Sequence, residues 1–225
     1  MVDTLDIQAL VLTLKLALAT TALLLLLGIP LAYWIAHSTG RLGRLVEALV
    51  ALPLVLPPTV LGFYLLVLLG PATLPGRLIT RLLGHSLAFS FAGLVVGSVL
   101  YSLPFAVQPI VAGFRGVDTE LLEAATLLGA SRWARLLRVS LPLAYFSVVT
   151  GAVLAFTHTV GEFGVVLMIG GSIPGVTQTL SISIFDQVQN FSYAAANRTA
   201  LLLLCFSFFT LLVIYTRRGG LSARG

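Results

Sequence analysis

The amino-acid sequence predicts an all-α integral membrane protein, a polytopic bundle of transmembrane helices. Of its 225 residues, 58% are hydrophobic and only 9% are charged, whereas a typical soluble domain carries roughly 25% charged residues. A chain of this size in water would still have to cover itself with polar side chains, so the deficit indicates a lipid bilayer as the surrounding medium. The apolar residues also gather in runs long enough to cross a bilayer, for which a helix needs about 20 of them.

Five segments reach that length, and we treat residues 1–225 as a single transmembrane domain. The segments cover about residues 9–36, 45–69, 87–114, 143–169 and 195–215. The stretch from Gly170 to Asn190 is less apolar and is interrupted by glycine and proline. We therefore expect an external loop there, with a short re-entrant or surface helix over Thr179–Val188. A sixth span in this stretch is the alternative topology.

The distribution of arginine predicts the orientation of these spans, because Lys and Arg concentrate in cytoplasmic loops. With the N-terminus outside, the inner segments are residues 37–44, 115–138 and 217–225, and they hold nine arginines. The outer segments hold three. We therefore predict five spans with the N-terminus outside and the C-terminus inside.

Several function classes lack their sequence signatures. The arginines lie between apolar runs and are not interleaved with aromatic residues, as they would be in a nucleic-acid-binding patch. Cys205 is the only cysteine, which rules out a disulfide or a thiolate metal site within one chain. No His, Asp or Glu cluster has metal-ligand spacing, and no phosphate-binding loop with its lysine occurs. We expect no metal site, no catalytic residues and no cofactor, ATP included, bound by this chain.

Proline is concentrated in the second apolar segment, where Pro53, Pro57 and Pro58 precede Thr59. Each proline removes a backbone donor and disturbs the preceding turn, and in lipid the freed carbonyl groups must find partners. We interpret this segment as a kinked, pore-lining element, with a plain packing kink as the alternative. Pro57, Pro58 and Thr59 are our first candidates for the pore or its gate.

The longest inner connection, residues 115–142, predicts two short amphipathic helices joined by a glycine turn. Asp118 or Thr119 can cap the first helix, and Gly129 suits the left-handed residue that ends one. Ser131 can cap the second helix. Leucines at helical spacing give the first helix an apolar face. Such a projection fits a groove on a soluble partner, and a helix lying on the lipid surface is the alternative.

The same connection resembles the EAA loop of ABC importer permeases. Glu123-Ala124-Ala125 is followed after three residues by Gly129 and, after nine more, by Val139-Ser140-Leu141-Pro142. The family pattern has Ile where this chain has Val139. The resemblance implies a type I importer permease core in the bacterial inner membrane, with an ATPase subunit on the cytoplasmic side that binds ATP and Mg²⁺. It assigns the coupling role to Glu123, Ala124, Ala125, Gly129, Val139, Leu141 and Pro142.

Two further stretches resemble molybdate permeases within that family. They are residues 52–62 and the run Gly161-Glu162-Phe163-Gly164, and with the EAA loop the resemblance covers about residues 10–215. It implies molybdate transport by alternating access, fed by an extracytoplasmic oxyanion-binding protein. Because the chain has a single EAA loop, we also expect two copies of it to form the pore as a homodimer. Sulfate, thiosulfate or tungstate are the alternative substrates.

Glu162 is the only carboxylate near the fourth apolar segment. An ionisable group at membrane depth is a functional hypothesis by default, but a carboxylate repels an anion. We therefore assign Glu162 a structural or gating role between helices and count it with Phe163 among the gate candidates, with a polar contact at a helix end as the alternative. His158 is expected to be packed and hydrogen-bonded. An intramembrane hydrolase using Ser98 and His158 is a rival function, although neither lies in a nucleophile motif, and a passive channel is a third.

Overall fold

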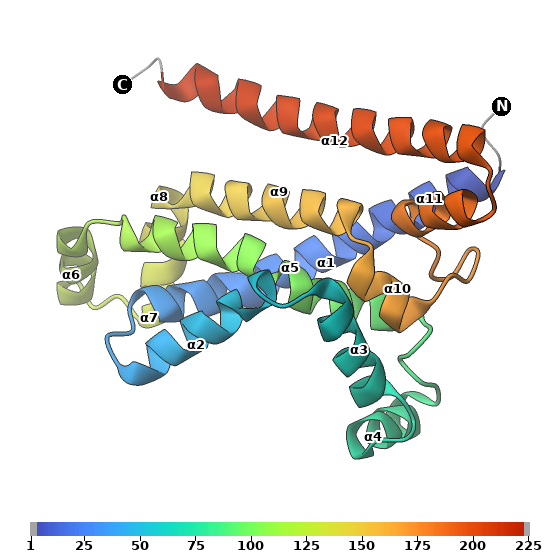
Figure 1. Ribbon diagram of the computed structural model, residues 1–225. Helices are drawn as coiled ribbons and strands as arrows, with labels where there is room; N and C mark the ends of the chain where they lie inside the picture. Colours follow the sequence, from blue (N-terminus) through green and yellow to red (C-terminus); the bar gives the residue numbers. More distant parts are fainter. Residues whose placement is uncertain (1–3, 223–225) are drawn as a thin grey trace. The chain divides into compact units, whose positions relative to one another are not determined.

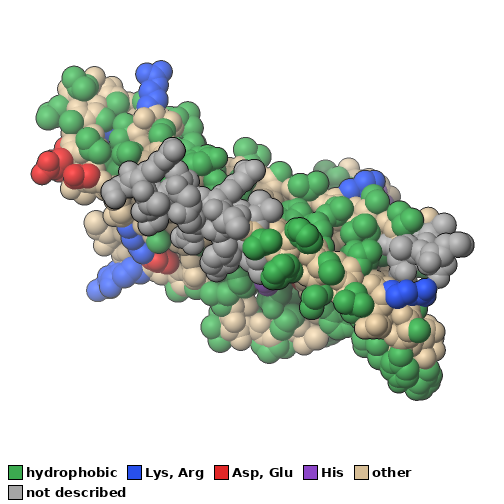
Figure 2. Space-filling view, turned by 90° about the horizontal axis from the view of Figure 1, so that it is seen from above, with side chains coloured by type: hydrophobic (Ala, Val, Ile, Leu, Met, Phe, Trp, Pro, Cys, Tyr) green, Lys and Arg blue, Asp and Glu red, His purple; other side chains and the backbone are tan. Residues whose placement is uncertain are grey.

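The chain is helical throughout the part that the structure describes. The computed structural model describes residues 4–222, and its regular elements in that range are all helices (Figure 1). Hydrophobic side chains cover much of the face seen in Figure 2, and large apolar residues such as Leu26 and Phe209 are exposed. Exposing such side chains to water costs about 1.5–3 kcal/mol each, so this surface belongs in lipid. The prediction of an all-α membrane protein is confirmed.

Within residues 4–222, three helices are long and apolar enough to cross a membrane by themselves. They are α1 (Thr4–Ala36), α5 (Phe91–Arg115) and α12 (Tyr193–Ser222). They correspond to the first, third and fifth predicted segments, but α1 begins at Thr4 and not at about residue 9, and α12 continues to Ser222 and not to about residue 215. The third segment begins at Phe91 instead of residue 87 because the Ser90 hydroxyl accepts a hydrogen bond from the Gly93 amide at 3.1 Å, which caps the helix there.

The second predicted segment is a broken helix. It contains α2 (Arg41–Ala51), the 3₁₀ turn η1 (Leu52–Leu54) and α3 (Pro58–Leu69), and the two halves are bent by 109°. The break falls at Pro57 and Pro58, where backbone donors are missing. The predicted kink is therefore present, and the angle is large enough for a broken span or a re-entrant loop.

The fourth predicted segment is also interrupted, and here the structure differs from a single rod over residues 143–169. The short α8 (Leu141–Leu143) is followed by α9 (Tyr145–Gly161), with a bend of 80° between residues 132–143 and α9. A separate helix, α10 (Gly164–Gly170), begins after Glu162 and Phe163. With each bent pair counted as one span, the described residues give up to five spans.

Two of the short helices follow the broken segments. α4 (Leu74–Leu83) follows α3, and α11 (Leu180–Gln189) follows α10. The Thr179 hydroxyl accepts a hydrogen bond from the Ile182 amide and caps α11. Ten residues are too few to cross a bilayer, so α11 matches the predicted short helix and not a sixth span.

The contacts within the chain divide it into two compact units, of which the first comprises the described parts of Met1–Ala17, Pro58–Ser98 and Thr159–Gly225. Its buried core contains Leu16, Leu94, Val166 and Ile182. The Leu180 amide donates a hydrogen bond of 2.9 Å to the buried Thr13 hydroxyl. This bond fixes the start of α11 to α1.

The second unit comprises Leu18–Pro57 and Val99–His158. Its core is built from apolar side chains of α1, α2, α5 and the chain after α6, namely Ala32, Ile35, Val50, Val107, Ile110, Val111, Phe114, Leu136 and Ala144. At its surface the Arg115 guanidinium donates two hydrogen bonds, of 2.8 and 2.7 Å, to the Glu47 carboxylate. This paired contact joins α2 to α5.

Candidate functional site

The predicted loop over residues 115–142 begins with a capped helix, α6 (Thr119–Leu127), in the second unit (Figure 1). The structure places the cap on Asp118, whose carboxylate accepts a hydrogen bond of 2.9 Å from the Glu120 amide. A carboxylate at this position also interacts favourably with the positive end of the helix dipole. The predicted start of the first amphipathic helix is confirmed.

Gly129 ends α6 in the left-handed conformation, with φ of +81°. The Gly129 amide donates to the Thr126 carbonyl at 2.9 Å, and the Ala130 amide donates to the Ala125 carbonyl at 3.0 Å. These two bonds form a Schellman motif. A side chain added at Gly129 would meet no atom within 4 Å, so it is the backbone conformation, and not a lack of space, that favours glycine here.

After the glycine turn the chain forms a second short helix, α7 (Arg132–Arg135), as predicted. Its cap is Ser131, whose hydroxyl accepts from the Ala134 amide at 3.2 Å. A π-helical turn, η2 (Leu136–Ser140), leads into α8. Such turns often occur at functional sites. Val139 and Leu141 are half-buried, and Pro142 is exposed in α8.

The two short helices are tied together by a contact that sequence reasoning missed. One terminal nitrogen of Arg135 donates a hydrogen bond of 2.9 Å to the Thr126 hydroxyl on α6. The two residues are nine apart, with the turn at Gly129 between them, and no periodicity in the sequence signals the bond.

The exposed surface of α6 differs from the single apolar face that leucine spacing predicts. Leu122 is buried at 7% exposure, whereas Leu127 and Leu128 are 89% and 88% exposed. Glu123 and Ala124 are exposed as well, and Ala125 is half-buried. The loop therefore anchors itself through Leu122 and presents two leucines beside Glu123 at its tip. This combination of an apolar tip and a charge suits contact with another surface.

Two distant parts of the sequence that hold gate candidates, one beginning at Pro58 and the other ending at Gly164, lie close together in the first unit. A Cβ atom added at Gly164 would lie 2.6 Å from Cβ of Pro58 and 3.5 Å from the amide nitrogen of Thr59. The start of α10 therefore packs against the start of α3. Phe163 precedes this contact, and its ring lies 5.2 Å from that of Phe185 on α11. Pro57 is exposed.

Glu162 lies in the break between α9 and α10 and is only 5% exposed. Both of its carboxyl oxygens are buried without a hydrogen-bond partner of normal geometry among the described residues. The Ser98 hydroxyl is also buried without a hydrogen-bond partner of normal geometry among the described residues. A carboxyl that is buried without a hydrogen bond costs free energy, and such a group in a folded protein needs an explanation. This setting suits the predicted gate, and the roles of the gate residues stay predictions.

His158 is packed and hydrogen-bonded in the second unit, as expected. Its Nδ1 lies 2.9 Å from the Ser102 hydroxyl, and its ring stacks on Phe105 with centroids 3.9 Å apart. The partner is thus Ser102, not the Ser98 of the hydrolase hypothesis. Sequence reasoning missed Ser102 and Phe105, although their spacing of three places them on one face of α5.

No group of three or more His, Cys, Asp or Glu side chains that could hold a metal ion occurs within the residues that the structure describes. The expectation that this chain binds no cofactor stays a prediction.

Residues 28–219 match the family described as binding-protein-dependent transport system inner membrane component. Among individual proteins, the chain is similar to the molybdenum transport system permease protein ModB of Azotobacter vinelandii. The two are 51% identical over 214 residues, which cover 95% of this chain and 94% of the relative.

Solved structures of ABC transporters have the same fold. An inward-facing MetNI methionine ABC transporter superposes with a TM-score of 0.72 at 16% identity, covering 94% of each chain. A bacterial alginate ABC transporter in complex with a pentasaccharide-bound periplasmic protein superposes with a TM-score of 0.71 at 19% identity, covering 94% of this chain and 77% of that one. At these identities the likeness concerns the fold alone.

Proposed function

We propose that this chain imports molybdate, because it belongs to the family of binding-protein-dependent transport system inner membrane components and is 51% identical, over 95% of its length, to a molybdenum transport permease. That identity is the observation that carries the proposal. The chain is the membrane-spanning permease subunit, and a separate ATPase subunit hydrolyses ATP. An extracytoplasmic binding protein delivers the anion.

Uptake into proteoliposomes tests the substrate. The permease and its ATPase are reconstituted with ATP inside and the loaded binding protein outside. Labelled molybdate should accumulate, and excess unlabelled molybdate should compete more strongly than sulfate or thiosulfate. Stronger competition by sulfate or thiosulfate would reassign the substrate. Accumulation without ATP would instead indicate a passive channel.

The loop over residues 115–142 is proposed to transmit ATPase movement to the membrane helices. α6 inserts into a cleft of the ATPase, where its exposed tip is covered, and Gly129 lets the chain turn back toward α7. Because α7 is joined through η2 and α8 to α9, displacement of α6 pulls on a membrane helix. ATP-driven closure then opens the path outward, and hydrolysis resets it.

Substitutions at Glu123 and Gly129 test this coupling. Glu123→Gln should lower molybdate uptake while ATP hydrolysis continues, and Glu120→Gln, an equally exposed change on the same helix, should leave uptake near normal. Gly129→Val should lower uptake because a β-branched residue is strained at positive φ, whereas Gly129→Asn should retain most of it. Normal uptake in both Glu123→Gln and Gly129→Val contradicts the coupling role.

Two copies of this subunit are proposed to form the translocation path around a two-fold axis. A single chain with one coupling loop suits a symmetric pair that engages two ATPase subunits. The proposed orientation, with the N-terminus outside, places both loops on the ATPase side. The orientation rests on the distribution of arginines between the two sides. One of the counted arginines, Arg224, lies outside the described residues.

A further inference from the structure

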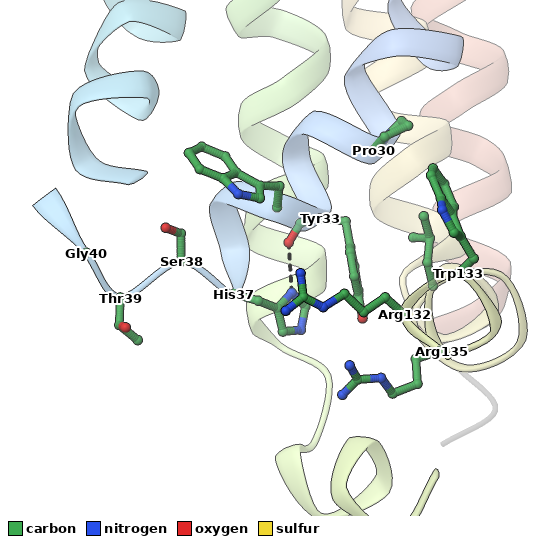
Figure 3. A pocket seen from close by; sticks show the side chains of 11 residues that line it. Pro30, Tyr33, His37, Ser38, Thr39, Gly40, Arg132, Trp133 and Arg135 are labelled. Carbon is green, nitrogen blue, oxygen red and sulfur yellow. Dashed lines mark hydrogen bonds between the residues drawn. The ribbon is translucent and has the colours of Figure 1, made fainter. Parts of the chain in front are cut away.

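The second unit contains a pocket of about 650 Å³ between the end of α1 and the start of α7 (Figure 3). Figure 3 shows the Arg132 and Arg135 side chains extending from α7 toward the end of α1, where His37 lies. The polar and aromatic groups that line it are Tyr33, Trp34, His37, Arg132, Trp133 and Arg135.

The pocket carries positive charge without a counter-charge. None of its eleven lining residues is acidic, and the one described salt bridge of the chain joins Arg115 to Glu47, which do not line it. The Arg132 side chain makes no hydrogen bond or ion pair with any described residue. The pocket therefore offers guanidinium donors to an anion from outside the chain.

One of these guanidinium groups is held in place. A terminal nitrogen of Arg135 is bonded to the Thr126 hydroxyl at 2.9 Å, while its Nε is buried and has no partner among the described residues. Opposite, Nδ1 of His37 contacts the Tyr33 carbonyl at 2.8 Å, and the two rings lie 4.3 Å apart. A positioned arginine with an unused donor loses less entropy on binding an anion than a free surface arginine does.

Size and aromatic content distinguish a lipid headgroup from a free oxyanion. The pocket is as large as pockets that hold small organic molecules, about 300–1,000 Å³, and much larger than a tetrahedral oxyanion needs. Both tryptophans of the chain line it, and both are exposed. Tryptophan concentrates at the level of lipid headgroups, and basic pockets on the cytoplasmic side of membrane helices bind anionic headgroups.

We propose that this pocket binds the headgroup of an anionic lipid, with Arg132 and Arg135 holding the phosphodiester and the two tryptophans covering the glycerol. In the proposed orientation the pocket faces the cytoplasmic leaflet. Through Arg135 and Thr126 it is also in direct contact with α6. A bound lipid therefore stabilises the position of α7 and, through the Arg135–Thr126 hydrogen bond, of α6, which is proposed to engage the ATPase.

Lipid binding to the purified, delipidated full-length permease tests the proposal without requiring transport. Phosphatidylglycerol and phosphatidylcholine are titrated in detergent, and bound lipid is counted by native mass spectrometry. The intact protein should prefer phosphatidylglycerol. Arg132→Gln should weaken its binding by about fivefold, and Arg132→Gln with Arg135→Gln by about thirtyfold, with phosphatidylcholine binding unchanged.

The matched control removes the same charge outside the pocket. Arg44 and Arg138 are exposed and do not line it, so Arg44→Gln with Arg138→Gln should bind phosphatidylglycerol like the intact protein. An equal loss in this control overturns the pocket assignment, because general surface charge then explains binding. Displacement of the lipid by inorganic phosphate or molybdate at comparable concentration assigns the pocket to a free oxyanion and overturns the lipid proposal. If the double variant does not fold, phosphatidylglycerol binding by the single variant Arg132→Gln tests the proposal. This variant should fold, because the Arg132 side chain is exposed and makes no hydrogen bond or ion pair with any described residue.

Discussion

Gly62 shows how a single residue sets a helix contact in the first unit. A Cβ atom added to it would lie 2.7 Å from Cβ of Met168 and 3.1 Å from Cα of Val165. Neither atom is the free end of a flexible side chain, so α3 and α10 would have to separate. Gly62→Ala should therefore destabilise the protein by about 1–3 kcal/mol and lower its thermal unfolding midpoint in detergent.

Gly161→Ala provides the matched control, since an added Cβ there meets no atom within 4 Å. Gly161 is the last residue of α9, where the helix preference of alanine over glycine counts less than in a helix interior, so this variant should unfold at about the same temperature as the intact protein. A larger loss for Gly161→Ala than for Gly62→Ala would show that α3 and α10 do not pack in this way.

The two glycines also show what the sequence can and cannot predict. A local pattern predicts that a helix ends at Gly129, because a capped apolar helix precedes it and a cap residue follows it. Gly62 has no such local signal, since its neighbours in space come from a helix about one hundred residues later. The neighbouring residues in the sequence determine a local conformation such as a helix end, whereas the close approach of two helices depends on the whole fold.

At the scale of elements, one of the two broken segments can be predicted from local sequence and the other cannot. The sequence predicts the break before α3, because proline disturbs the turn of helix in which it lies. The break at Glu162 and Phe163 contains no proline and lies inside an apolar run. It coincides with the packing of Gly164 against Pro58, a contact that the sequence alone does not reveal.

The element α6 yields a prediction that separates docking from folding. Leu128 is 88% exposed, so Leu128→Ser should change permease stability by no more than about 0.5 kcal/mol. If the ATPase covers this leucine, the same change removes about 1.5–3 kcal/mol of apolar burial and weakens ATPase binding by about ten- to a hundredfold. A binding titration of purified ATPase against the permease in nanodiscs measures it.

The control for this prediction is Leu122, which is buried on the same helix. Leu122→Ser should lower the unfolding midpoint clearly, by the equivalent of about 2–5 kcal/mol. Unchanged ATPase affinity in Leu128→Ser, with weaker association of the loop with lipid, would instead identify α6 as a helix lying on the membrane surface.

At the scale of the whole molecule, the sequence predicts the membrane spans, which the bilayer requires, but few of the surfaces that contact partners. Hydrophobic runs are required of every span, so their number and approximate limits could be predicted without the structure. Other features are seen only in the structure. They are the exposed Leu127 and Leu128, the unpaired arginine side chain of the pocket, and the buried Glu162 carboxyl without a hydrogen bond. The same sequence therefore predicts the scaffold more completely than the site.

Orientation is the property of the whole molecule on which the functional proposal depends, and cysteine labelling measures it. In a background with Cys205→Ser, the variants His85→Cys and Thr39→Cys each place one thiol at an exposed position in a loop. A membrane-impermeant maleimide added to intact cells should label position 85 and not position 39, and permeabilised cells should label both. The physical reason is the arginine excess on one side, because moving those charges across the bilayer during insertion is unfavourable.

Labelling of position 39 alone in intact cells would place the loop of α6 outside, where no ATPase could reach it. That result would contradict both the orientation and the coupling proposal.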